Sequence, residues 1–388
     1  MDKESIQKKL DALIAKYEKN EYVFEKLCNH INKTLPTLLE AAENTHTTRE
    51  KRKKELTLGT DEFIEKFLLR KRYFYCNQNE LFVNYDGMHF SPYSEDNIQH
   101  DILTQITLKQ NLRPWKHRIK NTIIKRIKDL SPLMAIPESK TIQNILKLLT
   151  PTIFVTRNHA KYFLTVIGDC LLSKTDKGTQ LIYITSNSLK ELVREISVQA
   201  YTNFGINNID KYIKYKHYGH DFWTSRLLSI DSNIKISSDF VCNFCKYALD
   251  IFCVAAHYSN RFGSADGFLY KCSNTILVDH ALYLHRNTTE SIVEAFLKEC
   301  MLPCESGSIK TKSIRFIWKK WLEKQKVPNI IFYDTLNTLF KNKLQYDEQN
   351  DSYHNITSSH LPEVASFLQF WDKHMQEDVC ELELEIDE

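Results

Sequence analysis

Glycine and proline are both scarce in this chain, with 9 of each among 388 residues. Glycine is the residue that enters positive φ without steric cost, so few glycines mean few tight turns and few loops that can cradle a phosphate. Hydrophobic residues make up 42% of the sequence and charged residues 26%, which is enough apolar material for ordinary cores. The length suggests two or three folded domains.

Apolar residues recur at three- and four-residue steps through much of the sequence, as they do on one face of an α-helix. The first such stripe, within a helical stretch expected at 5–45, contains Ile6, Leu10, Leu13 and Tyr17. The charged run 49–54 has no core pattern, and we expect a linker there. Further helices are predicted at 61–69, 114–130, 139–149, 157–173, 188–203, 238–257 and 289–301.

Two aromatic segments, 73–76 and 81–85, change to a strand-like pattern and are followed by Asp86-Gly87. This pair predicts a hairpin, because a type I′ turn needs positive φ at both of its central residues. Ser94 is then expected to cap a helix whose first turn carries Glu95 and Asp96. Residues 180–185 predict one further strand.

The last part of the sequence has an order of its own. Helices are predicted at 312–324 and 333–344, followed by a polar stretch at 345–357 whose acidic residues suit a hairpin tip. A final helix is expected from Ser358 or Ser359 to Met375. This helix–helix–hairpin–helix order resembles a winged helix.

The expected fold class is therefore mainly α with small β hairpins, an α+β fold with a multi-helix core and a C-terminal winged-helix-like module. The domains expected are an N-terminal helical region with a basic linker, a central helical domain with a β hairpin, the winged-helix-like module and an acidic tail. Their ranges are 1–58, 59–305, 306–376 and 377–388.

The N-terminus is polar from the start and lacks the apolar stretch of a secretory signal. No run approaches about 18 apolar residues, so no membrane span is expected. The ten cysteines are scattered, and many lie on apolar faces, which indicates free thiols in a reducing, intracellular compartment.

The segment 109–128 carries many basic residues and no aspartate or glutamate. On a helical wheel, Trp115, Ile119, Ile123 and Ile127 gather on one side, so the opposite side presents a cationic strip that a phosphate backbone can neutralise. A solvated basic helix is the alternative. The candidate nucleic-acid-binding residues here are Lys109, Arg113, Lys116, His117, Arg118, Lys120, Asn121, Lys125, Arg126 and Lys128.

The second helix of the winged-helix-like module is a second candidate surface. In helix-turn-helix modules this helix enters the major groove. The acidic hairpin tip would repel phosphate, so a protein-docking role stays open. The polar candidates on this helix are Thr335, Asn337, Thr338, Lys341, Asn342 and Lys343.

Three other groups of polar residues are candidate sites. Cys242 and Cys245, with Cys300 and Cys304, have a zinc-like count, but buried small hydrophobes explain them better and no metal or other cofactor is expected. The remaining two groups are better explained as polar turns than as a metal-dependent nuclease site. They are His217, His220 and Asp221, and the cluster from His257 to Asp266.

No complete catalytic motif is present. The sequence lacks the Gly-rich loop with Lys and Ser or Thr that binds nucleotide phosphates, and it lacks dinucleotide, zinc-protease and serine-hydrolase signatures. Paired carboxylates such as Glu95 and Asp96 begin helices and are explained as caps. An enzymatic role is therefore not expected.

The aromatic hairpin 81–87, the helix that Ser94 caps and the basic helix together resemble the helical region that precedes the ATPase in poxvirus-type and giant-virus primase–helicases. The C-terminal segment is similar to the winged-helix module that follows that ATPase. The resemblance covers residues 60–270 and 310–375, and the richness in Asn, Lys, Ile and Tyr fits an AT-rich genome of a large DNA virus. The ATPase itself is missing, so no catalytic residue carries over and helicase activity is contradicted. The resemblance implies a DNA-binding or partner-docking relic of a replication protein.

The sequence thus favours a non-enzymatic nucleic-acid-binding protein of a large DNA virus, acting in replication, transcription or packaging. DNA is the expected partner ahead of RNA, a viral protein is a further expected partner, and no membrane contact is expected. Expected locations are the host cytoplasm, the viral factory or the virion. The alternative is a virion-structural or interaction scaffold without nucleic-acid contact.

Overall fold

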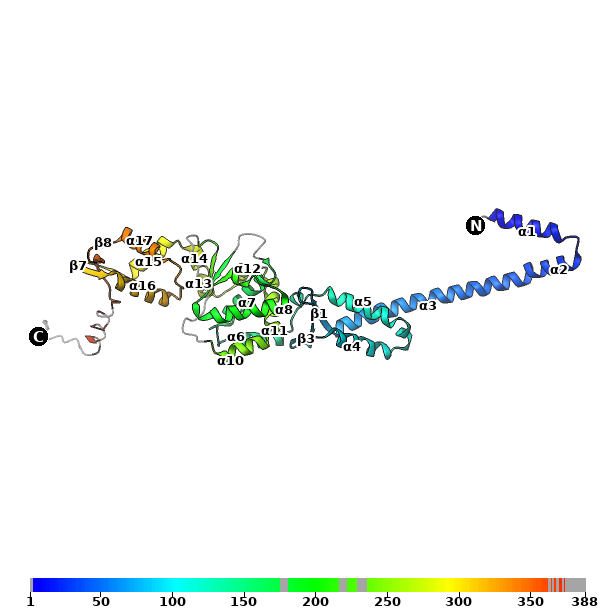
Figure 1. The fold of residues 1–388 in the computed structure, drawn as a ribbon, viewed down its shortest axis with the longest axis horizontal. Coiled ribbons are helices and arrows are strands. Elements are labelled where there is room, and N and C mark those ends of the chain that lie inside the picture. The colour runs from blue at the N-terminus through cyan, green and yellow to red at the C-terminus, as the bar shows by residue number, and fades with distance from the viewer. Residues whose placement is uncertain are drawn as a thin grey trace. The chain divides into compact units, whose positions relative to one another are not determined.

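The computed structural model describes residues 3–174, 181–215, 222–228 and 236–361, together with 364, 366, 367, 370, 371 and 373. The chain is 68% helical with small three-stranded sheets, which confirms the expected mainly α, α+β fold class. It divides into two compact units, residues 1–71 with 95–126 and residues 72–94 with 127–388 (Figure 1).

The first unit begins with α1 (Lys3–Tyr17), α2 (Glu21–Asn29), a π-helical turn (His30–Thr34) and α3 (Leu35–Arg70). The charged run 49–54 lies inside α3, so the expectation of a linker there is wrong. Lysine, arginine and glutamate are good helix formers, and an exposed helix needs no core pattern to remain helical. The predicted domain boundary at 58 also falls inside this helix.

Only the C-terminal end of α3 is buried, through Phe63, Ile64 and Phe67. It packs with α4 (Glu95–Thr107), a 3₁₀ turn (Gln110–Trp115) and α5 (Lys116–Lys128), whose isoleucines supply most of the remaining apolar contacts. Isoleucines at three- and four-residue spacing give each helix one apolar face, and these faces bury each other.

The second unit starts with an antiparallel meander of β1 (Arg72–Cys76), β2 (Leu81–Tyr85) and β3 (Phe90–Tyr93). Tyr85 pairs with Phe90, so a four-residue loop joins β2 and β3 and the predicted type I′ turn is wrong. Gly87 has a positive φ of +96°, but Asp86 does not. The side chain of Asp86 accepts hydrogen bonds from the backbone N–H groups of Met88 and His89 at 2.7 Å each. These donors hold the pKa of Asp86 below its usual range.

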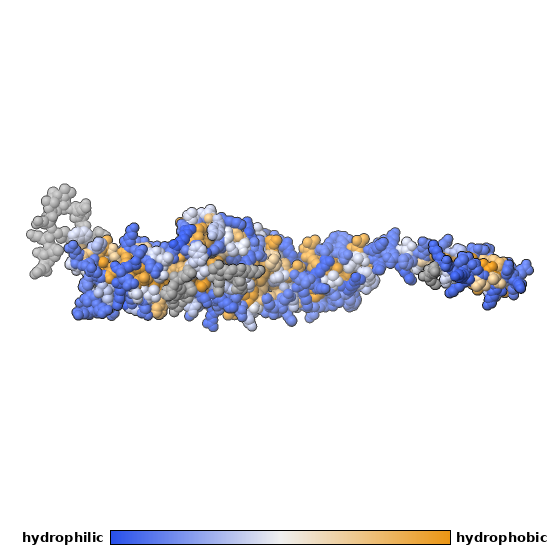
Figure 2. Space-filling view, turned by 90° about the horizontal axis from the view of Figure 1, so that it is seen from above, coloured by the Kyte–Doolittle hydropathy of each residue, from blue (hydrophilic) through white to orange (hydrophobic). Residues whose placement is uncertain are grey.

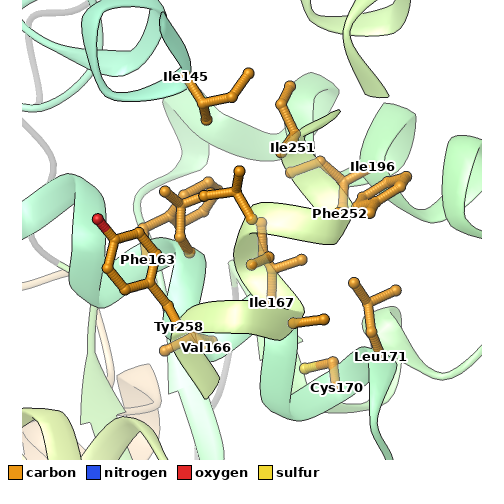
Figure 3. Close-up of a cluster of buried hydrophobic side chains, with 14 of the residues drawn as sticks. Ile145, Phe163, Val166, Ile167, Cys170, Leu171, Ile196, Ile251, Phe252 and Tyr258 are labelled. Carbon is orange, nitrogen blue, oxygen red and sulfur yellow. The ribbon is translucent and has the colours of Figure 1, made fainter. Parts of the chain in front are cut away.

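The main core of this unit surrounds α7 (Arg157–Leu171) and α11 (Ala248–Phe262), which are buried on nearly all sides. The side chains of Phe163, Ile167 and Phe252 lie in one apolar cluster between helices (Figure 3). The elements around them include α6 (Ser139–Leu149), α8 (Lys190–Phe204), α10 (Ser238–Lys246) and α12 (Ala265–Lys271).

The helix predicted at 238–257 is two helices, because α10 and α11 meet at Tyr247 with a bend of 72°. Among the described residues no single helix is long and apolar enough to cross a membrane, although this bent pair passes such a test when its two helices are taken together.

A small parallel sheet of β5 (Ile213–Lys214), β4 (Ile182–Ile184) and β6 (Ser225–Leu227) separates two apolar clusters. Side chains alternate across a strand. Tyr183 accordingly belongs to the cluster of α7 and α11, and Ile184 belongs to the cluster that continues to the C-terminal module. The short helices α9 (Ile209–Tyr212), α13 (Thr275–Ala281) and α14 (Tyr283–Arg286) connect these parts.

The C-terminal module contains α15 (Thr289–Cys300), β7 (Leu302–Lys310), α16 (Thr311–Gln325), α17 (Tyr333–Lys343), β8 (Gln345–Asp347) and β9 (Ser352–Thr357). The helix–strand–helix–helix–strand–strand order and the sheet order β7–β9–β8 are those of a winged helix. The predicted hairpin is confirmed, with its tip at 348–351.

The predicted boundary between residues 305 and 306 falls inside β7. Gly307 and its neighbours therefore lie in a strand of the sheet rather than at a domain boundary. A Cβ at Gly307 would lie 2.6 Å from the backbone oxygen of Ile356 on β9, so the two strands approach closely there. Within the final helix predicted from Ser358 or Ser359 to Met375, residues 358–361 are not helical, whereas 364, 366, 367, 370, 371 and 373 are helical. The other residues of this range and the whole acidic tail 377–388 lie outside the described residues.

His280 on α13 gives this unit a pH-dependent stability. Burial lowers its pKa, and its Nε2 lies 3.1 Å from the backbone oxygen of Lys326. The unfolded chain then binds a proton more readily than the folded one, so stability is present above the unfolded value of 6.5 and falls as the pH drops towards the lowered pKa. We expect the urea midpoint to fall less between pH 7.5 and 5.5 in His280→Gln than in the wild type. Parallel profiles would contradict this.

Candidate nucleic-acid interface

Helix α5 is held by the same isoleucine stripe that the sequence indicates. Ile119, Ile123 and Ile127 are fully buried, and Trp115 just before the helix is half-buried. Pro114 lies in the preceding 3₁₀ turn, so the α-helix begins at Lys116. Because the buried stripe fixes the rotation of α5, its opposite side must face solvent.

That opposite side is cationic and open. The side chains of Arg118 and Lys125 are exposed there, and Lys116 is exposed at the first residue of α5, on the isoleucine side of the helix. Among the described residues no carboxylate lies within ion-pair distance of these three cations. His117 and Asn121 are exposed beside them. The strip therefore carries charge that no carboxylate in the described part of the chain neutralises.

The structure narrows the predicted strip, because other basic residues of the segment are already engaged. Lys120 is half-buried and donates to the Gln99 side chain at 3.1 Å, and Arg126 forms an ion pair with Glu65. Arg113 donates to the backbone oxygen of Thr107 at 3.1 Å. The apolar periodicity of this segment cannot reveal such partners, since they lie on α3 and α4.

Lys128 and Lys109 lie against aromatic rings. The Nζ of Lys128 lies 5.3 Å from the centre of the Tyr75 ring, and that of Lys109 lies 5.3 Å from the Phe63 ring. Lys109 also lines a hollow of about 620 Å³ with acidic as well as basic neighbours. These two lysines therefore add less free charge than Lys116, Arg118 and Lys125.

The open strip has the reach of a short phosphate track. Arg118 and Lys125 are seven residues apart, about 10 Å along the helix axis, which matches about three nucleotides of one strand at 3.4 Å each. The Arg118 guanidinium lies 4.8 Å from the Trp115 ring centre, which restricts its direction. Arg118 can still offer several N–H donors to a phosphate.

The exposed side of α17 borders a second candidate surface. Residues at helical spacing on α17 line a hollow of about 270 Å³ together with the start of α16 and the β8–β9 hairpin. Its lining residues are Thr311, Arg315, Asp334, Asn337, Thr338, Lys341, Tyr346, Asp351 and Tyr353. The guanidinium of Arg315 lies 3.8 Å from the Tyr333 ring centre. The sequence does not single out Arg315, because the apolar stripe of α16 indicates only packing in the core.

The predicted residues of α17 are not equally placed. Thr338, Lys341 and Asn342 are exposed, and Lys341 lies 4.1 Å from the Tyr346 ring centre. Thr335 is half-buried.

Two predicted residues of α17 are less able to reach a ligand. Lys343 is ion-paired with Glu294 at 2.5 Å. Asn337 is half-buried, and its Oδ1 has no hydrogen-bond partner among the described residues.

The hollow beside α17 is electrostatically mixed. Hydrogen bonds from Thr311 and Tyr346 hold the pKa of Asp351 below its usual range, so this carboxylate stays charged. Asp334 lies in the same lining. Two carboxylates therefore face two cations, and this surface attracts a polyanion less than α5 does.

The three other polar groups singled out in the sequence differ in what the structure shows of them. Cys242 and Cys245 lie on one turn of α10, and no group of three or more ligand residues able to hold a metal occurs in the described part of the chain. His217, His220 and Asp221 lie outside the described residues. Within the cluster from His257 to Asp266, Asp266 forms an ion pair with Arg226 at 2.8 Å.

Comparisons with known proteins add no assignment: no family model, curated protein or solved structure matches this chain.

Proposed function

We propose that this protein binds nucleic acid, DNA ahead of RNA, through the exposed cationic face of α5. The observation that carries the proposal is that Arg118 and Lys125 project from the face of α5 opposite its isoleucines, with Lys116 exposed at the first residue of the helix, and that none of these three cations has a carboxylate partner in the described part of the chain. Such a face gains free energy when it displaces the counterions of a phosphate backbone. A neighbouring core stripe keeps the three cations on a rigid element rather than on a loop.

The winged-helix-like module supports the same proposal, since this topology recurs in proteins that place a helix in the major groove. Thr338, Lys341 and Asn342 are the exposed residues of α17 that would face bases or backbone. Together with the resemblance of the sequence layout to the non-ATPase segments of primase–helicases, these features favour a non-enzymatic role in the replication, transcription or packaging of a large DNA virus.

The proposal predicts a salt-dependent affinity that depends on α5. In the variant Lys116→Glu, Arg118→Glu, Lys125→Glu, we expect affinity for a 25-base-pair duplex at 0.1 M salt to fall at least about 30-fold. The slope of log K against log salt should fall by roughly 2 to 3, because each phosphate contact contributes about 0.9. Fluorescence anisotropy with duplex DNA, single-stranded DNA and RNA measures both quantities.

A matched control carries the same charge change on exposed lysines elsewhere, Lys211→Glu, Lys271→Glu and Lys298→Glu. It should change affinity by a few-fold only. Equal losses in the two variants would mean that net charge rather than α5 governs binding, and an unchanged α5 variant would remove the strip from the proposal.

The alternative is that the strip docks an acidic protein. Poly-glutamate of matched charge distinguishes the two partners, since it offers carboxylates without the spacing of a phosphate backbone. Tighter binding to poly-glutamate than to DNA would favour the interaction scaffold, whereas tighter binding to DNA supports the proposal.

A further inference from the structure

The N-terminal helices carry large apolar side chains that face solvent. Leu38 and Leu39 at the start of α3 are 62% and 60% exposed, and Ile6 on α1 is 56% exposed. Hydrophobic and hydrophilic side chains lie together on the surface of these helices (Figure 2). Scattered apolar residues are normal on a protein surface, but an ordered stripe of them marks an interface.

Apolar residues of these helices form an ordered stripe, in which Ile6, Leu13, Leu35 and Leu39 are exposed and Leu10 and Tyr17 are half-buried. Ile6, Leu10, Leu13 and Tyr17 on α1 alternate four- and three-residue steps, which is the spacing of the contact positions in a coiled coil. On the following helices the same spacing is kept by two groups of three. These are Phe24, Leu27 and Ile31 before the π-helical turn, and Leu35, Leu39 and Ala42 after it.

The π-helical turn His30–Thr34 explains how the two groups can lie in one line. Ile31 and Leu35 are four residues apart, where the coiled-coil spacing calls for three. A π turn accommodates one extra residue, so the stripe on α3 stays in phase with the stripe on α2. Without a packing partner along this line, nothing would favour keeping it in phase.

The chain itself covers only part of this stripe. Phe24, Leu27 and Ile31 are half-buried where α1 packs on α2. Leu35 and Leu39 remain exposed. An ordered apolar stripe that remains open to solvent is a surface on which another element can pack.

Charge identifies the partner as a second copy of the chain. Helix α1 carries four lysines and two carboxylates, and is net basic. Residues 35–43 carry Glu40 and Glu43 and no basic residue. We propose that the N-terminal helices of two copies associate, with the exposed stripe residues Ile6 and Leu13 of α1 in one copy packing on Leu35 and Leu39 of the other.

The first test uses the full chain and light scattering. The wild type is expected at twice the monomer mass at micromolar concentration, and Leu35→Glu with Leu39→Glu is expected to raise the dimer dissociation constant at least about 100-fold. The control Leu58→Glu with Leu69→Glu changes two exposed leucines of α3 that lie off the stripe, and it should stay dimeric. A monomeric wild type, or a dimeric stripe variant, overturns the proposal.

The second test asks whether the opposite charges meet between copies. Lys8→Glu with Lys9→Glu, and separately Glu40→Lys with Glu43→Lys, should each weaken association about tenfold by placing like charges together. Mixing the two variants should restore it, because both contacts of the mixed dimer again join opposite charges. Weakening without restoration would mean that the charges meet within one chain, and the second copy would lose its support.

Discussion

Replacing Gly168 by alanine is expected to cost the second unit about 3 kcal/mol of its unfolding free energy. Gly168 lies in α7 where that helix meets α11, and a Cβ there would lie 2.1 Å from the backbone oxygen of Ala255. It would also lie 2.7 Å from the Cβ of Ser259. A backbone oxygen in the middle of a buried helix cannot move aside as a flexible side chain can, so α7 and α11 must separate.

Gly59 provides the matched control. It also lies in a helix, α3, but a Cβ there would have Leu112 as its nearest neighbour at 3.9 Å, an ordinary contact. Gly59→Ala should therefore stabilise its helix by about 0.5–1 kcal/mol through backbone entropy. Urea unfolding followed by circular dichroism compares the two variants. A loss below about 1 kcal/mol at Gly168 would contradict the close helix contact.

The two glycines illustrate what periodicity can and cannot reveal. The spacing of apolar residues predicts α7 well, since long periodic stretches are the strongest signal in a sequence, and it indicates the helical state of α11 but not the break at Tyr247 before it. It does not say which helices touch. Nothing at Gly168 or Ala255 indicates that their backbones approach so closely, because that fact belongs to tertiary packing.

The missed elements have physical reasons. Strand β4 lies within the strand predicted at 180–185, but β5 and β6 are two or three residues long, too short to show an alternating pattern, and they pair with β4 through residues far apart in sequence. The run 49–54 was assigned to a linker because a helix was expected to need an apolar face. It is part of α3, where charged residues with high helix propensity continue the element.

The candidate interface was predictable to the extent that one helix determines it. The Ile119–Ile123 spacing fixes which side of α5 faces solvent, and Arg118 and Lys125 lie on that side as expected, whereas Lys116 is exposed at the first residue of the helix on the isoleucine side. The partners that engage Lys120 and Arg126 come from other helices and could not be anticipated. Because Lys120 and Arg126 are engaged by these partners, the mutational test needs to change only Lys116, Arg118 and Lys125.

A buried ion pair gives the other large expected effect. The Nε and Nη2 atoms of Arg226 on β6 donate to the two carboxylate oxygens of Asp266 at 3.0 and 2.8 Å, and Arg226 is 5% exposed. Its Nη1 donates to the backbone oxygens of Trp223 and Ser225. Asp266→Ala leaves the guanidinium buried without a counter-charge, and we expect a loss of about 3 kcal/mol.

A double-mutant cycle separates this pair from the packing around it. Asp266→Ala and Arg226→Met each remove one partner, and the double variant removes both charges, so its cost should be smaller than the sum of the two single costs by about 2 kcal/mol. The coupling should persist in 0.5 M salt, because a pair this buried is weakly screened. Strictly additive costs, measured by urea unfolding, would show that Arg226 does not depend on Asp266. The polar cluster from His257 to Asp266 would then need a role other than holding α12 to the parallel sheet.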